Sequence, residues 1–146
     1  MKSIFFAILL TLAISNISYS QFRMTTSVGY GLKVNSRYDF ELFQSSISVT
    51  PQYDIDKINV SAVIMAVNDS TAELFTGIKG GYQVWSEDTK RLVISASALK
   101  GFEGKTLFGG GVSYTVDNTF VSADAYQENE NKEFWAMLSA GVYILR

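Results

Sequence analysis

The sequence predicts an all-β fold: an eight-stranded antiparallel up-and-down β-barrel that spans a membrane and is preceded by a cleaved signal peptide. From Phe22 to Val34, large apolar side chains alternate with small or polar ones. Because successive side chains of a strand point to opposite faces of the sheet, this segment has one apolar and one polar face. The alternation recurs in seven further segments separated by short polar turns. An even number of strands is what a closed antiparallel barrel with both chain ends on one side requires.

The N-terminal segment has the pattern of a secretory signal peptide. Lys2 supplies the positive charge, Ile4 to Ile14 are apolar, and the small residues Ser18 and Ser20 precede Gln21. An uncleaved anchoring helix is the alternative, but the apolar run is short for a membrane span and no basic flank follows it. We therefore expect a signal peptide over residues 1–20 and an eight-stranded β-barrel over residues 21–146.

The alternation and the turn residues set the boundaries of the predicted strands. Asn, Asp, Gly and Ser are concentrated between the segments, where tight turns need residues that tolerate left-handed backbone. We place the strands at Phe22 to Val34, Glu41 to Ile55, Ile58 to Val67, Ala72 to Trp85, Arg91 to Lys100, Lys105 to Val116, Thr119 to Gln127 and Glu133 to Leu145. Pro51 lies inside the second segment, and its missing N–H predicts a strand end or a bulge there.

The composition of the polar face decides which face points outward. A soluble ligand-binding barrel places its apolar face inside and needs a charged exterior. Here the polar face consists mainly of Gly, Ser and Thr, which suit the narrow interior of an eight-stranded barrel, so the apolar face is expected to contact lipid. Part of the interior is expected to be apolar as well, at Val63, Met65, Val67, Val93 and Leu99. Two alternatives stay open: a soluble secreted lipocalin-like barrel that binds a small apolar ligand, and a narrow pore for small solutes.

Aromatic residues on the apolar face concentrate near strand ends, where a transmembrane barrel places belts at the level of the lipid headgroups. Phenylalanines lie near the starts of the second, sixth and eighth predicted strands, and tyrosines near the ends of the second, fourth and sixth. The membrane-interface belt that we expect consists of Tyr30, Phe43, Tyr53, Tyr82, Phe108, Tyr114 and Phe134.

Charged residues on the predicted inner face must be paired, because an unpaired charge in so narrow a space is costly. We expect a lumen charge network that plugs the barrel, formed by Arg23, Lys33, Asp54, Lys79 and Asp124.

The composition also argues against several functions. The chain has no histidine and no cysteine, so the commonest general base, the commonest metal ligands and thiol nucleophiles are missing. We therefore expect no enzymatic activity, no cofactor and no metal site. The net charge of −2 is weak, which argues against a nucleic-acid partner.

The chain resembles the small eight-stranded outer-membrane barrels of the OmpA and OmpX type. The resemblance rests on the signal Met1 to Ser20, the alternating segments, and a last strand from Phe134 that ends at the C-terminus. Members of this family usually end in an aromatic residue that the insertion machinery reads, whereas this chain ends in Ile144-Leu145-Arg146. The resemblance implies an outer-membrane location, outer-membrane lipid and the insertion machinery as partners, and a monomer. Because every predicted connection is short, we expect a structural role or surface interaction with an unidentified partner, rather than a loop-built receptor.

Overall fold

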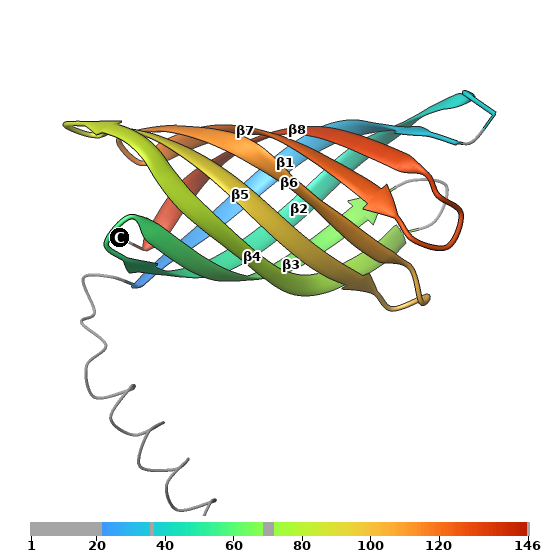
Figure 1. The fold of residues 1–146 in the computed structure, drawn as a ribbon, viewed down its shortest axis with the longest axis horizontal. Helices are drawn as coiled ribbons and strands as arrows, with labels where there is room; N and C mark the ends of the chain where they lie inside the picture. The colour runs from blue at the N-terminus through green and yellow to red at the C-terminus, as the bar shows by residue number, and fades with distance from the viewer. Residues whose placement is uncertain (1–21, 36, 69–71, 146) are drawn as a thin grey trace, which may run out of the picture.

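The structure is a closed antiparallel barrel in which each strand pairs with its neighbours in sequence and β1 pairs with β8. It is a computed structural model that describes residues 22–35, 37–68 and 72–145, with residues 43–45 and 145 described by their backbone only. The predicted signal peptide lies outside the described residues. The strands tilt around the barrel axis (Figure 1) and are β1 (Phe22–Val34), β2 (Phe40–Ile55), β3 (Ile58–Asn68), β4 (Ala72–Glu87), β5 (Lys90–Gly101), β6 (Thr106–Val116), β7 (Thr119–Glu128) and β8 (Phe134–Leu145).

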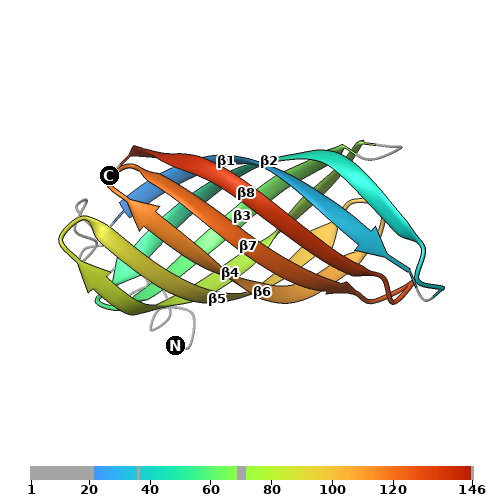
Figure 2. The ribbon, with the colours of Figure 1, turned by 90° about the horizontal axis from the view of Figure 1, so that it is seen from above.

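The two ends of the barrel, which lie at opposite sides of Figure 2, differ in their connections. At the end where β1 begins and β8 ends, which we call the turn end, the strands are joined by residues 56–57, 88–89 and 117–118. Asp56, Asp88 and Asp117 have φ of 54°, 50° and 52° there, a backbone conformation that Asp tolerates better than most residues. At the opposite end, the loop end, the connections are residues 35–39, 69–71, 102–105 and 129–133.

The predicted two-faced pattern is confirmed. In β6, Phe108 and Val112 are 53% and 46% exposed on the outside of the barrel, whereas Thr115 is 2% exposed inside it. In β3, exposed and buried residues alternate at every position from Val60 to Asn68. Large apolar residues therefore point outward, and small or polar ones line much of the interior. A soluble barrel around an apolar ligand needs the reverse packing, so that alternative is wrong.

The strand boundaries agree with the predicted ones within two residues, but the expectation for Pro51 is wrong. Pro51 lies inside β2, and the register with β3 is the same before and after it, as the pairs Val49↔Ile64 and Gln52↔Ser61 show. Residues 50 and 51 form no pairs with β3, so the missing N–H of Pro51 interrupts the ladder there but causes no bulge.

Over the residues that the structure describes, no helix is long and apolar enough to cross a membrane.

Two inward glycines lie where neighbouring backbones leave no room for a side chain. A Cβ at Gly77 would collide with the carbonyl oxygen of Ala98 on β5, and a Cβ at Gly109 with that of Ala125 on β7. The outward Gly80 differs, because a Cβ there would meet no atom within 4 Å. Close packing of the β6 and β7 backbones therefore requires a glycine at position 109.

Val112→Lys tests which face meets lipid. A lysine at mid-depth on the outer face of β6 is expected to lower the free energy of unfolding by about 2 to 4 kcal/mol. Ser113→Thr, the next residue but on the inner face, is expected to be mild. Urea titration of both variants in lipid vesicles measures the difference, and equal losses would show that the two faces are assigned the wrong way round.

Gly109→Ala and Gly80→Ala form a matched pair that tests the close backbone packing. Gly109→Ala is expected to lower the free energy of unfolding by about 1 to 3 kcal/mol, because the added methyl group forces the β6 and β7 backbones apart. Gly80→Ala is expected to raise it by about 0.4 to 1 kcal/mol, because alanine restricts the unfolded chain. Losses of the same size in both variants would contradict the geometry.

Candidate functional site in the barrel lumen

An apolar cluster fills the loop-end half of the lumen. Phe75 and Trp135 are 0% and 2% exposed, and their rings meet edge to face with centroids 5.7 Å apart. Such packed aromatic pairs add stability beyond the area they bury. The predicted apolar positions of β3 and Leu99 belong to this cluster, which comprises Val63, Met65, Val67, Phe75, Leu99, Leu107, Tyr126, Trp135 and Met137.

Charged groups surround the apolar cluster at the loop end, and each has a partner. The Lys33 ammonium lies 4.3 Å from the ring centroid of Trp135, within the range of a cation–π interaction. Lys105 Nζ donates a hydrogen bond of 2.8 Å to Glu73 Oε2. Burial lowers the pKa of the Lys105 ammonium, but the hydrogen bond and charge of Glu73, together with the charges of Glu103 and Glu133, outweigh this effect, so the pKa lies above its ordinary value. The fully buried Glu128 accepts hydrogen bonds from two backbone N–H groups of the β7–β8 loop.

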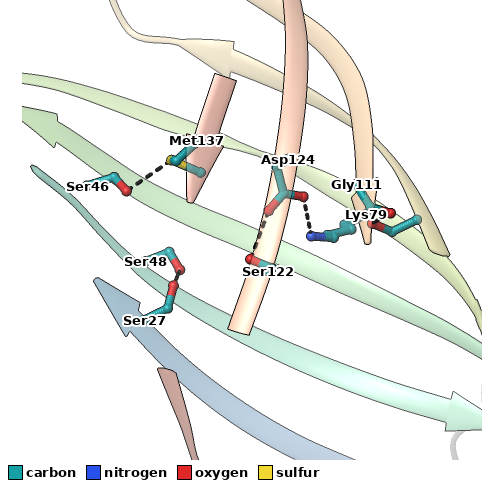
Figure 3. A network of polar contacts seen from close by, with 9 residues as sticks. Ser27, Ser46, Ser48, Lys79, Gly111, Ser122, Asp124 and Met137 are labelled. Carbon is teal, nitrogen blue, oxygen red and sulfur yellow. Dashed lines mark hydrogen bonds and ion pairs between the residues drawn. The ribbon is translucent and has the colours of Figure 1, made fainter. Parts of the chain in front are cut away.

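A polar layer lies at mid-lumen, next to the apolar cluster (Figure 3). Lys79 Nζ on β4 contacts Asp124 Oδ1 on β7 at 2.9 Å, and Ser122 Oγ donates to the other carboxylate oxygen at 3.0 Å. The Asp124 side chain is 3% exposed, so its charge depends on these two partners. On the other side of the lumen, Ser46 Oγ donates to the sulfur of Met137.

Three charged residues meet in the turn-end half of the lumen. Asp54 Oδ2 lies 2.8 Å from Arg23 Nε and 4.0 Å from Arg91 Nη1, so one carboxylate faces two guanidinium groups. Gln52 donates a hydrogen bond to the other oxygen of Asp54. The Arg23 guanidinium also lies over the ring of Tyr143, 5.7 Å from its centroid. We call Arg23, Asp54 and Arg91 the arginine cluster.

The structure divides the predicted lumen charge network into separate contacts. It pairs Arg23 with Asp54 and Lys79 with Asp124, but it places Lys33 on Trp135 at the loop end. The sequence analysis missed three inward charged residues, which are Glu73, Arg91 and Glu128. The alternation could have identified them, because each lies on the same strand face as residues that were assigned to the interior. Over the described residues, no group of three or more acidic, His or Cys side chains could hold a metal ion.

The residues of the predicted aromatic belt lie on the outer face wherever their side chains are described. Tyr30, Tyr82, Phe108, Tyr114 and Phe134 are exposed and Tyr53 is half-buried, whereas the side chain of Phe43 lies outside the described part. Their placement at the headgroup level stays a prediction.

Comparison with solved structures places this fold among known barrels, although no family model and no curated protein matches the chain. Neisserial surface protein A has a TM-score of 0.57 and 15% identity, and the match covers 86% of this chain and 97% of that one. The N-terminal β-barrel domain of Pseudomonas aeruginosa OprF has a TM-score of 0.51 and 15% identity, over 82% of this chain and 97% of that one. The fold is that of the small eight-stranded outer-membrane barrels.

A third solved structure has the same fold at still lower sequence identity. Ail, the attachment invasion locus protein of Yersinia pestis, has a TM-score of 0.52 and 7% identity, over 84% of this chain and 95% of that one. At such identities the likeness concerns the fold alone, and at this level the predicted resemblance to small outer-membrane barrels is confirmed.

A double-mutant cycle tests the Lys79 and Asp124 pair. Asp124→Leu is expected to lower the free energy of unfolding by about 3 to 5 kcal/mol, because it leaves the ammonium group in the lumen without its carboxylate. The double variant Lys79→Met/Asp124→Leu is expected to lose much less, since neither charge remains. Urea titrations of Lys79→Met, Asp124→Leu and the double variant measure the coupling, and purely additive losses would show that the pair is not coupled.

Proposed function

We propose that this protein is a monomeric, non-catalytic outer-membrane barrel whose lumen is closed to solutes and whose role is structural or depends on surface contacts at the loop end. In this proposal the turn end lies on the periplasmic side and the loop end faces the outside of the cell. The observation that carries the proposal is the combination of an apolar exterior with an apolar cluster that fills the lumen.

The exterior supports membrane insertion. Its exposed apolar residues include Val28, Ile47, Ile78, Val121 and Leu138, each at least 56% exposed, and they come from five different strands. A continuous apolar surface of this kind is unfavourable in water and favourable in hydrocarbon. Since the closed ring leaves no unpaired strand edge, the backbone is also compatible with lipid.

The interior supports closure. An eight-stranded barrel has room for inward side chains but not for a wide aqueous channel. Met65, Phe75, Leu99, Leu107 and Trp135 are each at most 2% exposed, so the loop-end half of the lumen is packed as a protein core is packed. A hydrated ion would have to displace these side chains to pass.

The loop end offers the surface for a partner. Tyr38, Phe40 and Leu42 on the β1–β2 hairpin and Phe102 on the β5–β6 loop are each at least 75% exposed. The β1–β2 hairpin projects beyond the neighbouring strands at this end in Figure 1. Exposed aromatic residues clustered at one end of a molecule are typical of interaction sites. Outer-membrane lipid and the insertion machinery are the further partners that the proposal implies.

Fractionation and conductance measurements test the proposal together. The protein is expected in the outer-membrane fraction, with a folded form that resists detergent until boiled and then changes its gel migration. In planar bilayers the wild-type barrel is expected to show no discrete conductance, whereas Phe75→Ala/Trp135→Ala, which opens the apolar cluster, is expected to show it. Recovery in the soluble periplasmic fraction would overturn the membrane location, and discrete conductance by the wild-type protein would overturn the closed lumen.

A further inference from the structure

The β1–β2 hairpin, which projects at the loop end in Figure 1, has an apolar outer face and a charged inner face. Lys33 lies opposite Glu41 in the ladder between β1 and β2, and Lys33 is buried against the ring of Trp135, so this pair marks the inner face. The residues next to them point outward. These outward residues, which we call the hairpin face, are Leu32, Val34, Phe40 and Leu42. A hairpin surrounded by water would be expected to carry polar side chains on both faces.

The register of the barrel shows how far out the hairpin face lies. Paired residues on successive strands form rows around the barrel. One row consists of Ser27, Ser48, Met65, Phe75 and Gly101, on β1 to β5 in order. Ser27 lies in the middle of β1, whereas Gly101 is the last residue of β5, at the loop end. A row therefore climbs towards the loop end from each strand to the next, by about 3 Å per strand for strands about 4.8 Å apart and tilted by about 40°.

The hairpin face extends further out than the apolar surface of β7. The row that contains Gln127 on β7 continues through Phe134 on β8 and Val34 on β1 to Phe40 on β2. Gln127 is an exposed polar residue on the outer face, where it ends the apolar surface of β7. Phe40 comes three strands later in the row, so it lies about 9 Å further towards the loop end. This distance is similar to the thickness of one lipid headgroup layer, which is about 5 to 8 Å.

The edge of the hairpin needs a hydrated environment. Over the described residues, the last pair between β2 and β3 is Ser45↔Asn68, so residues 40–42 of β2 pair with β1 alone. The backbone groups on their other side have no partner strand there, which hydrocarbon does not tolerate but a hydrated headgroup layer does. Glu41 adds a charge to this edge, and such charges discourage pairing with a further strand. The hairpin therefore fits beside lipid but above the hydrocarbon core.

Asn35 holds the tip of the hairpin in one conformation. Its side-chain oxygen accepts hydrogen bonds from the backbone N–H groups of Arg37 and Asp39 at 2.8 and 3.0 Å. Its carbonyl oxygen accepts one from the N–H of Tyr38 at 3.0 Å. Tyr38 has a φ of 62° and is 81% exposed, and the neighbouring Arg37 is exposed as well. Tyrosine and arginine suit the headgroup level, because each combines an apolar ring or stem with a polar end.

We propose that the β1–β2 hairpin lies in the headgroup layer of the outer leaflet, where Phe40 and Leu42 contact the upper ends of the lipid chains and Tyr38 and Arg37 contact the headgroups. Lipid fits better than a protein partner because the hairpin face continues the lipid-facing surface of β1 and β8 without a polar break. The hydrated edge and the residues at the tip agree with this position. The inference rests on the proposed membrane location, and it names the partner of one part of the loop-end surface.

Depth-dependent fluorescence quenching of the refolded barrel in phosphatidylcholine vesicles tests the proposal. The chain has no cysteine, so each variant carries a single thiol for a bimane label. Phe40→Cys places the label on the hairpin face, Ile47→Cys places it deeper on the same strand, and Glu103→Cys places it in the exposed β5–β6 loop. The quenchers are a lipid nitroxide near the headgroup, a lipid nitroxide deep in the acyl chain, and iodide in the water.

Each label is expected to respond most to a different quencher. The shallow nitroxide is expected to quench residue 40 about twofold more than residue 103, and iodide is expected to show the reverse preference, because the two loop-end sites differ in their distance from the headgroup layer. The deep nitroxide is expected to quench residue 47 most.

An aspartate on each face of the hairpin shows whether the apolar face causes this position. In the Phe40→Cys background, Leu42→Asp is expected to reduce quenching by the shallow nitroxide to the level of residue 103, because a charge on the hairpin face draws it into water. Glu41→Asp, the next residue but on the inner face, is expected to leave the quenching unchanged. Heat-modifiable migration confirms that each variant has refolded.

The outcomes separate this inference from the proposal on which it rests. If no lipid nitroxide quenches residue 47, the membrane location itself is wrong. If residue 47 is quenched but residue 40 responds to iodide as residue 103 does, the hairpin stands in water and the inference is overturned. Shielding of residue 40 from both iodide and lipid nitroxides would point to a protein contact, and deep quenching equal to that of residue 47 would place it in the hydrocarbon core. Either result would also overturn the inference.

Discussion

Closure of the sheet on itself is the constraint on which the rest of this structure depends. In hydrocarbon every backbone N–H and C=O must be paired within the protein, and a closed ring of strands satisfies them all without an edge. Eight strands make that ring narrow, so side chains from opposite walls share one space. Each inward residue must therefore be small, as Gly109 is, or must interlock with another, as Phe75 does with Trp135.

The two halves of the lumen fill this space by different means. At the loop end, packed apolar side chains gain from burial and from contact with one another, and no water is needed. At the turn end, charged and polar side chains leave a cavity that water can enter. Lys79 and Asp124 lie at the boundary, where the carboxylate is nearly dry and the ammonium is partly exposed. Burying such a pair is unfavourable unless its partners are well placed, and the hydrogen bond from Ser122 supplies one of them.

Much of the fold could be predicted from the sequence because it depends on local patterns. Alternation assigns the faces, and turn residues such as Asp117 mark the strand ends, so both were found without knowledge of the contacts. The contacts across the lumen depend on the register shift between neighbouring strands. These shifts add up around the ring, so the sequence of a single strand does not determine which residues meet. Lys79 and Asp124, for example, lie on β4 and β7, which are not neighbours. Their inward direction was predictable, but their pairing was not.

Register also explains why Lys33 does not join the arginine cluster. Lys33 lies directly opposite Trp135 in the ladder between β1 and β8, close to the loop end, whereas Arg23 lies near the start of β1 at the turn end. An inward basic residue can thus contact groups in either half of the lumen, and its position along the strand decides which half. In the proposed orientation, this arrangement places the apolar cluster between the external medium and the arginine cluster. An ion arriving from outside would have to lose its hydration in the apolar cluster before it could reach the arginine cluster, which is unfavourable.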